Sequence, residues 1–426
     1  MGNSEIIKVF EDKQRKVSLS KEQISDLTSM KSLIGENNLI LQTDGKILIK
    51  HYVGFVQLNK TRLLIYPKIS SASNDEAEYI KSFEILMKLL AFSDFTGLKR
   101  TPTPQMLDKY NGDLLEAFVG IFVDELLLQF KRDVNRGYNN ILENQSFIKG
   151  KVDFSETVKK NSFRKHLHYV RYDQFSEDIL LNKIFKSIVR NLIVRTNCKS
   201  NKLKLKQTLL RLEDVEAIAL DNEIWDTVKF TRHNNKYEAA FNMAKLFYFN
   251  TSPNLNAGDE LAFSFLVPVN RLFESYLYKV FKKAKLLDQR VNYQGPIDYL
   301  SYSEGKKYFQ LRPDITLSKE DRITCVIDAK YKNLFYDGQS LKLSQGDIYQ
   351  MLAYSVRYQC NDIILAYPRY LDETHKDMLI KELKIKNYNQ EVTIKLIKID
   401  LELNPELLAM DLKFLLDESS EGNPRD

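Results

Sequence analysis

One stretch of the sequence combines the residue types needed for chemistry on a phosphate ester. Residues 309–332 read FQLRPDITLSKEDRITCVIDAKYK, and Asp314, Asp328 and Lys330 stand out in this largely apolar segment. Two carboxylates that reach one point can hold a hard cation such as Mg²⁺. An ammonium group beside them can stabilise the charge that builds on a phosphoryl oxygen. Such chemistry requires that the fold bring the three side chains together.

A β-hairpin would bring them together. The polar run SKEDR at 318–322 predicts a turn, so the strands on either side are expected to pair antiparallel. With the turn centred on Glu320, Asp314 lies opposite Val326, and Asp328 is its diagonal neighbour on the same face of the sheet. Such neighbours have Cα atoms roughly 7–8 Å apart, close enough for both carboxylates to reach one cation. The lysine comes two residues further along the strand and shares that face.

This arrangement predicts a phosphodiester hydrolase. Asp314, Asp328 and the backbone carbonyl of Ala329 would hold Mg²⁺, which polarises the scissile phosphate and lowers the pKa of a bound water. Lys330 would orient that water or stabilise charge on the phosphoryl oxygens. The alternative is an exposed hairpin whose aspartates and lysine simply form ion pairs across the strands, contacts worth less than about 1 kcal/mol.

The chain that carries this hairpin has the composition of a globular protein with more than one domain. Its 426 residues exceed what one ordinary core supports, which predicts two or three domains. Apolar residues make up 43% and charged residues 28%, so extended disorder is not expected. The 63 lysines and arginines against 57 acidic residues leave a net charge of only +6. Any basic surface that binds a polyanion must therefore be local.

Cysteine usage and apolar segments predict a cytoplasmic protein. Cys198, Cys325 and Cys360 are far apart and form no CxxC or Cys/His cluster, which argues against a zinc site and a disulfide framework. The N-terminus lacks the apolar run of a signal peptide. The most apolar stretch, 114–130, is interrupted by charged residues and falls short of the ~20 clean residues of a membrane span. We expect it to be a helix buried within the protein.

Hydrophobic periodicity divides the chain into three parts. Residues 37–69 alternate apolar and polar positions around turn signals at 44–45 and 59–60, which predicts a small β-rich unit. Helical spacing then dominates until 249–260, where FNTSPNLNAGDE is rich in Asn, Ser, Pro and Gly and indicates a linker. An α/β order follows. The expected helices are 79–92, 113–133, 177–195, 203–220, 236–249, 268–285 and 344–357, and the expected strands after the linker are a hairpin within 306–332 and strands at 362–367 and 392–399.

The predicted fold class is therefore a multi-domain α+β protein. We expect a β-rich N-terminal region over 1–110 and a mainly helical middle region over 111–255. An α/β domain over 256–426 would carry the hairpin.

The hairpin motif resembles the signature of a known nuclease family. RPDI followed by VIDAKYK is similar to the PD-(D/E)xK pattern, with Pro313-Asp314 and Asp328-Ala329-Lys330 as its two elements. The resemblance implies that the C-terminal domain has a restriction-endonuclease-like fold and cuts DNA with Mg²⁺.

Two further matches accompany this signature. Twenty residues past Lys330, DIYQMLAYS supplies Gln350 and Tyr354, which match the QxxxY helix that often accompanies this core and share one helix face at i, i+4. Upstream, NRLFESYLYKVF puts Glu274 on the preceding helix, where many such nucleases carry an acidic residue that joins the metal shell. The resemblance adds Gln350, Tyr354 and Glu274 to the catalytic residues, and Glu274 to the metal ligands. The QxxxY helix is expected to contribute Tyr349, Met351, Leu352 and Val356 to the core.

The order of these motifs most resembles McrC, the nuclease subunit of McrBC-type restriction systems, and the related LlaJI-type restriction subunits. VGFVQLNKTRLLIYPKI at 53–69 is similar to the N-terminal β segment of that family, and the likeness covers most of 50–370. It implies a McrB-like AAA+ partner that hydrolyses GTP, carries the DNA-recognition domain and docks on the 1–110 region. The chain has no GxxxxGK[ST] motif of its own. Cleavage of both strands of double-stranded DNA makes a homodimer through the nuclease domain plausible.

Basic residues gather in one segment of the middle region. KKNSFRKHLHYVR at 159–171 would give salt-dependent, sequence-independent contacts to DNA phosphates. The alternative is an ordinary solvated face. The candidate DNA-binding residues are Lys159, Lys160, Arg164, Lys165 and Arg171.

Two other functions stay open at this point. The chain could be a stand-alone nuclease that recognises DNA through its own N-terminal domain and needs no nucleotide. It could instead be a non-catalytic regulator of the AAA+ motor with a degenerate nuclease core, although the intact Asp314, Asp328 and Lys330 argue against that alternative.

Overall fold

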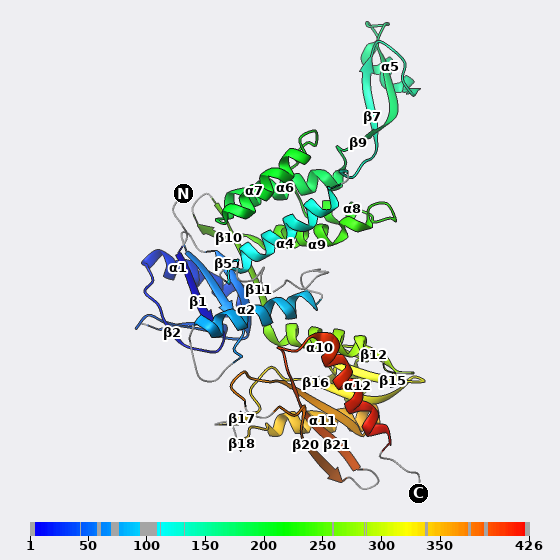
Figure 1. Ribbon diagram of the computed structural model, residues 1–426. Helices are drawn as coiled ribbons and strands as arrows, with labels where there is room; N and C mark the ends of the chain where they lie inside the picture. The colour runs from blue at the N-terminus through cyan, green and yellow to red at the C-terminus, as the bar shows by residue number, and fades with distance from the viewer. Residues whose placement is uncertain are drawn as a thin grey trace. The chain divides into compact units, whose positions relative to one another are not determined.

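The chain folds into two compact units. The computed structural model describes residues 5–42, 44–57, 61–69, 76–93, 109–110, 112–131, 133–257, 260–284, 286, 288–336, 340–373, 376–386 and 391–421. Residues 113–251 form one unit, which we call the middle unit, and residues 2–112 with 252–426 form the other, which we call the split unit (Figure 1). The middle unit has nearly the limits expected for the helical region, whereas the N-terminal and C-terminal parts of the chain share one unit.

The middle unit is built on a helix that is apolar on almost every side. This helix, α4 (Leu114–Gln129), begins at Asp113, whose carboxylate accepts the backbone N–H groups of Leu115 and Glu116. The carboxylate of Glu116 is buried, but the backbone N–H of Asn197 and the side chain of Asn201 donate to it at 2.6 and 2.9 Å. The expected buried helix is confirmed. α7 (Lys199–Arg211), η2 (Asn235–Tyr237) and α9 (Glu238–Phe249) contact α4, and α6 (Leu180–Arg195) packs on α7 and α9. The short α8 (Ile224–Thr227) belongs to the same unit.

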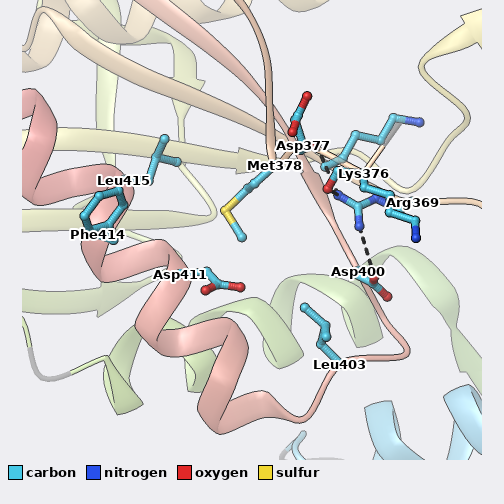
Figure 2. Close-up of a pocket in the computed structure, with 10 residues that line it drawn as sticks. Arg369, Lys376, Asp377, Met378, Asp400, Leu403, Asp411, Phe414 and Leu415 are labelled. Atoms are coloured by element: carbon cyan, nitrogen blue, oxygen red, sulfur yellow. Dashed lines mark hydrogen bonds and ion pairs between the residues drawn. The ribbon is translucent and has the colours of Figure 1, made fainter. Parts of the chain in front are cut away.

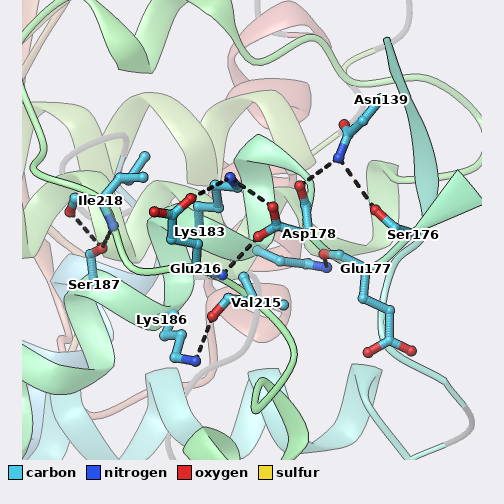
Figure 3. A network of polar contacts seen from close by, with 11 residues as sticks. Asn139, Ser176, Glu177, Asp178, Lys183, Lys186, Ser187, Val215, Glu216 and Ile218 are labelled. Carbon is cyan, nitrogen blue, oxygen red and sulfur yellow. Dashed lines mark hydrogen bonds and ion pairs between the residues drawn. The ribbon is translucent and has the colours of Figure 1, made fainter. Parts of the chain in front are cut away.

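Helix α7 is shorter than the expected 203–220, because its C-terminal continuation is held by another helix. On α6, Lys186 Nζ donates to the carbonyls of Leu212 and Val215 at 2.7 and 2.5 Å. Ser187 on the next position exchanges two hydrogen bonds with the backbone of Ile218 (Figure 3). These contacts take the backbone groups that a longer α7 would have used for its own ladder.

A long hairpin projects from the helices of the middle unit (Figure 1). We call residues 137–176 the arm. At its base, Asn139 donates to the carbonyl of Asp178 at 2.7 Å and to the hydroxyl of Ser176 at 3.3 Å (Figure 3). Phe163 near its tip is fully exposed. The arm consists of β7 (Gly137–Gln145), β8 (Lys151–Val152), α5 (Phe154–Asn161) and β9 (His168–Ser176), with strand order β7-β9-β8.

The first sheet of the split unit joins segments from both ends of the chain. Its strands, in order, are β1 (Glu5–Phe10), β6 (Thr61–Tyr66), β5 (Tyr52–Gln57), β11 (Glu260–Pro268) and β10 (Thr251–Ala257). β11 pairs antiparallel with β5, so that Phe265 lies opposite Phe55. The segment 249–260, interpreted from its composition as a linker, therefore contains a strand, and the expected boundary at 256 falls inside β10.

The β-rich character expected for 37–69 is confirmed, although its turn signal at 59–60 lies outside the described residues. Strands β3 (Leu39–Leu41) and β4 (Lys46–Ile49) join β2 (Arg15–Lys16) in a small sheet of order β2-β4-β3. Helix α1 (Lys21–Ile34) begins with a capping box between Ser20 and Gln23 and is followed by η1 (Glu36–Asn38). One apolar core joins α1 to both sheets of this region.

The second sheet of the split unit has six strands and carries the hairpin of interest. Its order is β12 (Arg290–Tyr293), β15 (Ile315–Lys319), β16 (Arg322–Ala329), β19 (Asp362–Pro368), β21 (Glu391–Ile399) and β20 (Leu379–Lys386). β16, β19 and β21 are parallel and the outer strands antiparallel. The expected hairpin within 306–332 is two hairpins, because β14 (Lys306–Leu311) pairs with β13 (Asp298–Ser303) in a sheet of its own.

Both faces of the central strands β16 and β19 are buried, as parallel central strands require. Val326, Ile363 and Leu365 share a core with Met351 of α11 (Gln345–Tyr358), whereas Ile327 and Ile364 are buried on the opposite face. Helix α10 (Val269–Lys283) contacts β16 and β12. The remaining elements are α2 (Glu76–Ala91), α12 (Pro405–Glu421) and the short β17 (Phe335–Tyr336) and β18 (Ser340–Leu341).

Contacts between chain segments far apart in sequence tie the split unit together. Lys88 on α2 donates to the carbonyls of Leu401, Glu402 and Leu403 at 2.7 to 3.1 Å. The Tyr331 hydroxyl donates to the carbonyl of Lys68 at 3.3 Å. Within the part of the chain that the structure describes, no helix has both the length and the apolar character to cross a membrane.

Candidate active site

The two aspartates of the hairpin lie opposite each other rather than diagonally. β15 pairs with β16 so that Ile315 faces Ile327, and extending this register by one residue sets Asp314 against Asp328. The expected register was wrong for two reasons. The turn centres between Glu320 and Asp321, which both have positive φ as a tight two-residue hairpin requires. A β-bulge at Leu317/Ser318 then shifts the pairing by one more residue.

Asp328 and Lys330 form a close, largely buried ion pair. Asp328 is 2% exposed, and its Oδ2 lies 2.6 Å from Lys330 Nζ. Lys330 Nζ also donates to Gln350 Oε1 at 3.0 Å. The alternative of an exposed hairpin with solvated ion pairs therefore does not describe this pair.

Asp314 stands beside this pair in an environment that favours its neutral form. Its Oδ2 accepts the backbone N–H of Ala329 at 2.8 Å. Burial, and then the nearby charges of Asp328 and Glu274, raise the pKa of Asp314 to about 8. Burial also raises the pKa of Glu274 and of Asp328. Three acidic side chains therefore lie near one another; Lys330 compensates the charge of Asp328, whereas that of Asp314 is poorly compensated.

Helix α11 presents its polar pair to this cluster. Gln350 Nε2 donates to the Tyr354 hydroxyl at 2.9 Å, and that hydroxyl donates to the Arg312 carbonyl at 3.1 Å. A continuous chain of polar contacts therefore runs from Lys330 through α11 to the residue two positions before Asp314. The expectation for the core side of the helix was partly wrong. Met351 is buried, but Tyr349 and Val356 are exposed, because the helix turns the buried Tyr354 towards the sheet.

Sequence reasoning missed two participants. Asp347 on α11 lies 3.9 Å from Lys330 Nζ and 2.5 Å from Lys332 Nζ. It stands three residues before Gln350, so helix periodicity could have found it. Gln294, after β12, donates to Glu274 at 3.3 Å, and its backbone N–H donates to the Asp314 carbonyl at 2.7 Å. No local pattern marks it, because its place depends on strand pairing.

The donor set fits a hard divalent cation in its chemistry. Carboxylates from Asp314, Asp328 and Glu274 are the oxygen ligands that Mg²⁺ prefers. Burial and the neighbouring carboxylates raise the pKa of Asp314, so a cation bound here would supply positive charge that the cluster lacks. The described residues hold no group of three His, Cys, Asp or Glu side chains already gathered for a metal ion. The cluster therefore has the ligand types that Mg²⁺ prefers, but its carboxylates are not already arranged around one point.

The candidate DNA-binding residues lie in the middle unit. All are exposed on the arm: two near the C-terminal end of α5, two in the turn after it and one on β9. Lys160 pairs with Glu156 at 2.8 Å and Arg171 with Asp153 at 3.0 Å. The five residues are Lys159, Lys160, Arg164, Lys165 and Arg171.

A pocket of about 360 Å³ lies elsewhere in the split unit, between α12 and the loops after β19 and β21 (Figure 2). Two of its charged groups form ion pairs: Arg369 Nη1 lies 3.0 Å from Asp400 Oδ2, and Lys398 pairs with Glu373. We interpret it as a structural feature, since the reactive cluster is not among its lining residues.

The fold and the cluster define a multi-domain α+β protein with a buried carboxylate–lysine site, and comparison with known proteins gives its family. Residues 47–368, well over half of the chain, match the family described as "McrBC 5-methylcytosine restriction system component". The chain therefore belongs to the McrBC family.

Relatives of this family are similar over much of the chain. The "Type IV methyl-directed restriction enzyme EcoKMcrBC" of Escherichia coli (strain K12) is 22% identical over 257 residues, which cover 58% of this chain and 74% of the relative. In a half-complex from the tetradecameric assembly of Thermococcus gammatolerans McrB AAA+ hexamers with bound McrC, one chain matches with TM-score 0.75 and 20% identity. That match covers 97% of this chain and all of the other. A second structure, the McrBC complex of the same organism, matches over 66% of this chain and 88% of the other with TM-score 0.50 and 22% identity.

Proposed function

We propose that this chain is the DNA-cleaving subunit of a McrBC-type restriction system and hydrolyses phosphodiester bonds at the Asp314–Asp328–Lys330 cluster. One observation carries the proposal. Two opposed carboxylates lie beside a lysine that pairs with Asp328 and donates to Gln350, and the two strands that carry or flank them belong to a rigid sheet. This combination matches the PD-(D/E)xK resemblance of the sequence and the membership in a restriction family.

Mg²⁺ is the cofactor that these residues fit. Asp314, Asp328, Glu274 and the backbone carbonyl of Ala329 would hold it. When bound, such an ion polarises a phosphoryl oxygen and lowers the pKa of a bound water. It would also relieve the repulsion that raises the pKa of the buried carboxylates.

The protein's own residues would do the remaining work. Lys330, with its amine fixed between Asp328 and Gln350, would stabilise charge on the phosphoryl oxygens. The hydrogen bond to Gln350 Oε1 would hold the amine in place, so that its position does not depend on Asp328 alone. The Tyr354 hydroxyl donates to the Arg312 carbonyl and so fixes the backbone just before Asp314.

The partner in this proposal is a McrB-like AAA+ NTPase. The Thermococcus gammatolerans structures contain McrB AAA+ hexamers with bound McrC, and this chain has no nucleotide-binding GxxxxGK[ST] motif of its own. We place the docking surface in residues 1–110. A homodimer through the C-terminal domain would supply two active sites, one for each strand of double-stranded DNA.

The docking proposal is tested by substitution rather than deletion. Removing residues 1–110 would take β5 away from β11 and Lys88 away from its three carbonyls, so a truncated chain is not expected to stay folded. Ile24 on α1 and Ile80 on α2 are both exposed. Ile24→Glu with Ile80→Glu should weaken stimulation of the partner's nucleotide hydrolysis. Val194→Glu, an exposed site on α6, is the matched control, and equal stimulation by both variants would move the docking surface elsewhere.

The nuclease proposal is tested on the complex. The chain, co-purified with a McrB-like AAA+ partner from its own organism, should cut plasmid DNA only when Mg²⁺ and a nucleoside triphosphate are present. Asp328→Asn should abolish cutting, whereas Asp362→Asn, at the exposed start of β19, should not. Cleavage without partner or nucleotide would favour a stand-alone nuclease. Stimulated nucleotide hydrolysis without any cleavage would favour a regulator.

A further inference from the structure

The hairpin of β13 and β14 leads directly into the candidate active site and is open to solvent. It forms a two-stranded sheet of its own, outside the six-stranded sheet. Every residue of β14 from Lys306 to Gln310 is exposed. Large apolar side chains of the hairpin are also exposed: Leu300, Tyr302, Tyr308 and Phe309. The exposed fraction of Phe309 is 73%. An isolated hairpin gains little stability from exposing large apolar side chains, so a role in binding is the natural explanation.

Phe309 is also held in a strained backbone conformation. Its φ is +56°, in the left-handed region that a bulky aromatic residue rarely adopts. The strands pair Tyr299 with Gln310 and Ser301 with Tyr308, and the two residues between these pairs, Leu300 and Phe309, are left out of the ladder. Strain of this kind persists where the surrounding structure imposes it, and it is concentrated at functional positions.

Helix α11 fixes the base of the hairpin. Arg357 binds both carboxylate oxygens of Asp298, at 2.8 and 2.7 Å, and donates to the Tyr302 hydroxyl at 2.9 Å. The Tyr358 hydroxyl contacts the carbonyls of Pro296 and Leu311 at 2.6 and 3.2 Å. The same helix carries Gln350 and Tyr354. The hairpin is therefore rigidly placed relative to the carboxylate cluster.

The distance from the hairpin to the cluster is short on the scale of DNA. Phe309 precedes Asp314 by five residues, so their Cα atoms are at most about 18 Å apart. One turn of duplex DNA is roughly 34 Å long. A duplex with its phosphate at Asp314 and Asp328 would thus present base pairs within reach of Phe309.

Charge decides which partner fits. Of the charged residues on the hairpin and its exit, Lys306, Lys307 and Arg312 are positive. Asp298 is neutralised by Arg357, which leaves Glu304 as the remaining acid. An exposed aromatic among basic groups suits a polyanion with flat, stackable bases. This points to DNA rather than to a protein surface.

We propose that Phe309 is a wedge that inserts between neighbouring base pairs of duplex DNA and unstacks them beside the phosphate to be cut. The inference rests on the proposed nuclease function and deepens it, because it assigns the step that presents a distorted duplex to the cluster. Lys306 and Lys307 contact the backbone on either side of the opened step. The clamp of Arg357 on Asp298 keeps the wedge at a fixed distance from Asp314.

A wedge has a signature that does not depend on knowing the recognition sequence. Inserting a side chain requires unstacking, and this costs least at a step that is already poorly stacked. The chain should therefore bind a duplex with a central mismatch more tightly than a perfectly paired duplex. A surface that only contacts phosphates would bind both equally.

The experiment measures binding of full-length chain to two duplexes of about 30 base pairs, roughly three helical turns, one perfect and one with a central mismatch. EDTA is present, so that no cleavage occurs. Wild type should prefer the mismatched duplex by roughly tenfold, as expected from aromatic–base stacking. Phe309→Gly should bind both duplexes equally and remain folded, because glycine accepts the positive φ without strain. Phe309→Trp should keep the preference, and so should Phe414→Gly, an exposed aromatic site on α12.

The outcomes separate the inference from the function on which it rests. A wild-type chain that binds DNA without any mismatch preference, or a Phe309→Gly variant that keeps the preference, overturns the wedge while the nuclease proposal stands. A Phe309→Gly variant that keeps the preference but loses the AAA+ partner shows a protein-binding hairpin and also overturns it. A complex that neither binds duplex DNA nor cuts plasmid DNA overturns both proposals.

Discussion

Two consecutive hairpins of the split unit differ in which side chains they bury and which they expose. The β15–β16 hairpin buries charge, with Asp328 at 2% exposure, and surrounds it with a sheet that is apolar on both faces. The β13–β14 hairpin exposes apolar groups, with Phe309 at 73% exposure, and has no sheet around it. Burying charge raises carboxylate pKa values and suits a reactive site, whereas exposing aromatics suits contact with another molecule. The difference teaches that, in the functions proposed above, chemistry and recognition are assigned to separate hairpins joined by residues 312–314.

The largest effect should come from the buried side of this comparison. Asp328→Asn should lower plasmid cleavage by the complex roughly 10³-fold or more, because it removes one of the opposed carboxylates that would hold the cation. The thermal midpoint should fall somewhat, because Lys330 loses its largely buried ion-pair partner. Cleavage and thermal unfolding are measured together. Cleavage at the wild-type rate in this variant would contradict the comparison, because Asp328 of the β15–β16 hairpin would then have no catalytic role.

Lys330→Ala should have the next largest effect. Removing a group that acts mainly on transition-state charge should lower the single-turnover cleavage rate roughly 10²-fold. DNA affinity in EDTA should change little, because recognition is assigned to the other hairpin. Lys332→Ala is the control, since Lys332 forms its ion pair with Asp347. A rate within a few-fold of wild type would make Lys330 a structural lysine.

Gln350→Ala tests whether the polar face of α11 positions the lysine. Losing a hydrogen bond to a charged group should lower the cleavage rate roughly tenfold and leave the mismatch preference intact. Gln345→Ala, at the exposed start of α11, is the matched control. Equal rates for Gln350→Ala and wild type would show that Asp328 alone holds the amine.

The smallest effect concerns the clamp on the exposed hairpin. The hydrogen bond from Arg357 lowers the pKa of Asp298 to about 2. Because this folded-state pKa lies below the ordinary value of about 3.9, the clamp is fully formed above about pH 4 and is lost only as the pH falls towards 2. Asp298→Asn should lower the mismatch preference about threefold, by the same factor from about pH 5 to about pH 8. A loss that varies over this range would mean that another group holds the hairpin.

Much of the reactive site could be predicted from the sequence. The identity of Asp314, Asp328 and Lys330, their place on two antiparallel strands and the i, i+4 pairing of Gln350 with Tyr354 all follow from local patterns. Periodicity reports which residues share a face of one element, and these relations survive folding. The expected helices of the chain agree with the observed bounds to within a few residues, apart from α7, whose end is set by hydrogen bonds from α6.

The sequence by itself determined the reactive residue types and the order of the elements, while the tertiary structure decided how those elements meet. The bulge at Leu317/Ser318 set Asp314 opposite Asp328, and the pairing of β11 with β5 drew the segment after the supposed linker into the N-terminal sheet. Gln294 reached Glu274 through the pairing of β12 with β15. Each of these depends on contacts between segments distant in the chain, for which local periodicity carries no signal, because strand partner and register are selected by the packing of whole apolar faces.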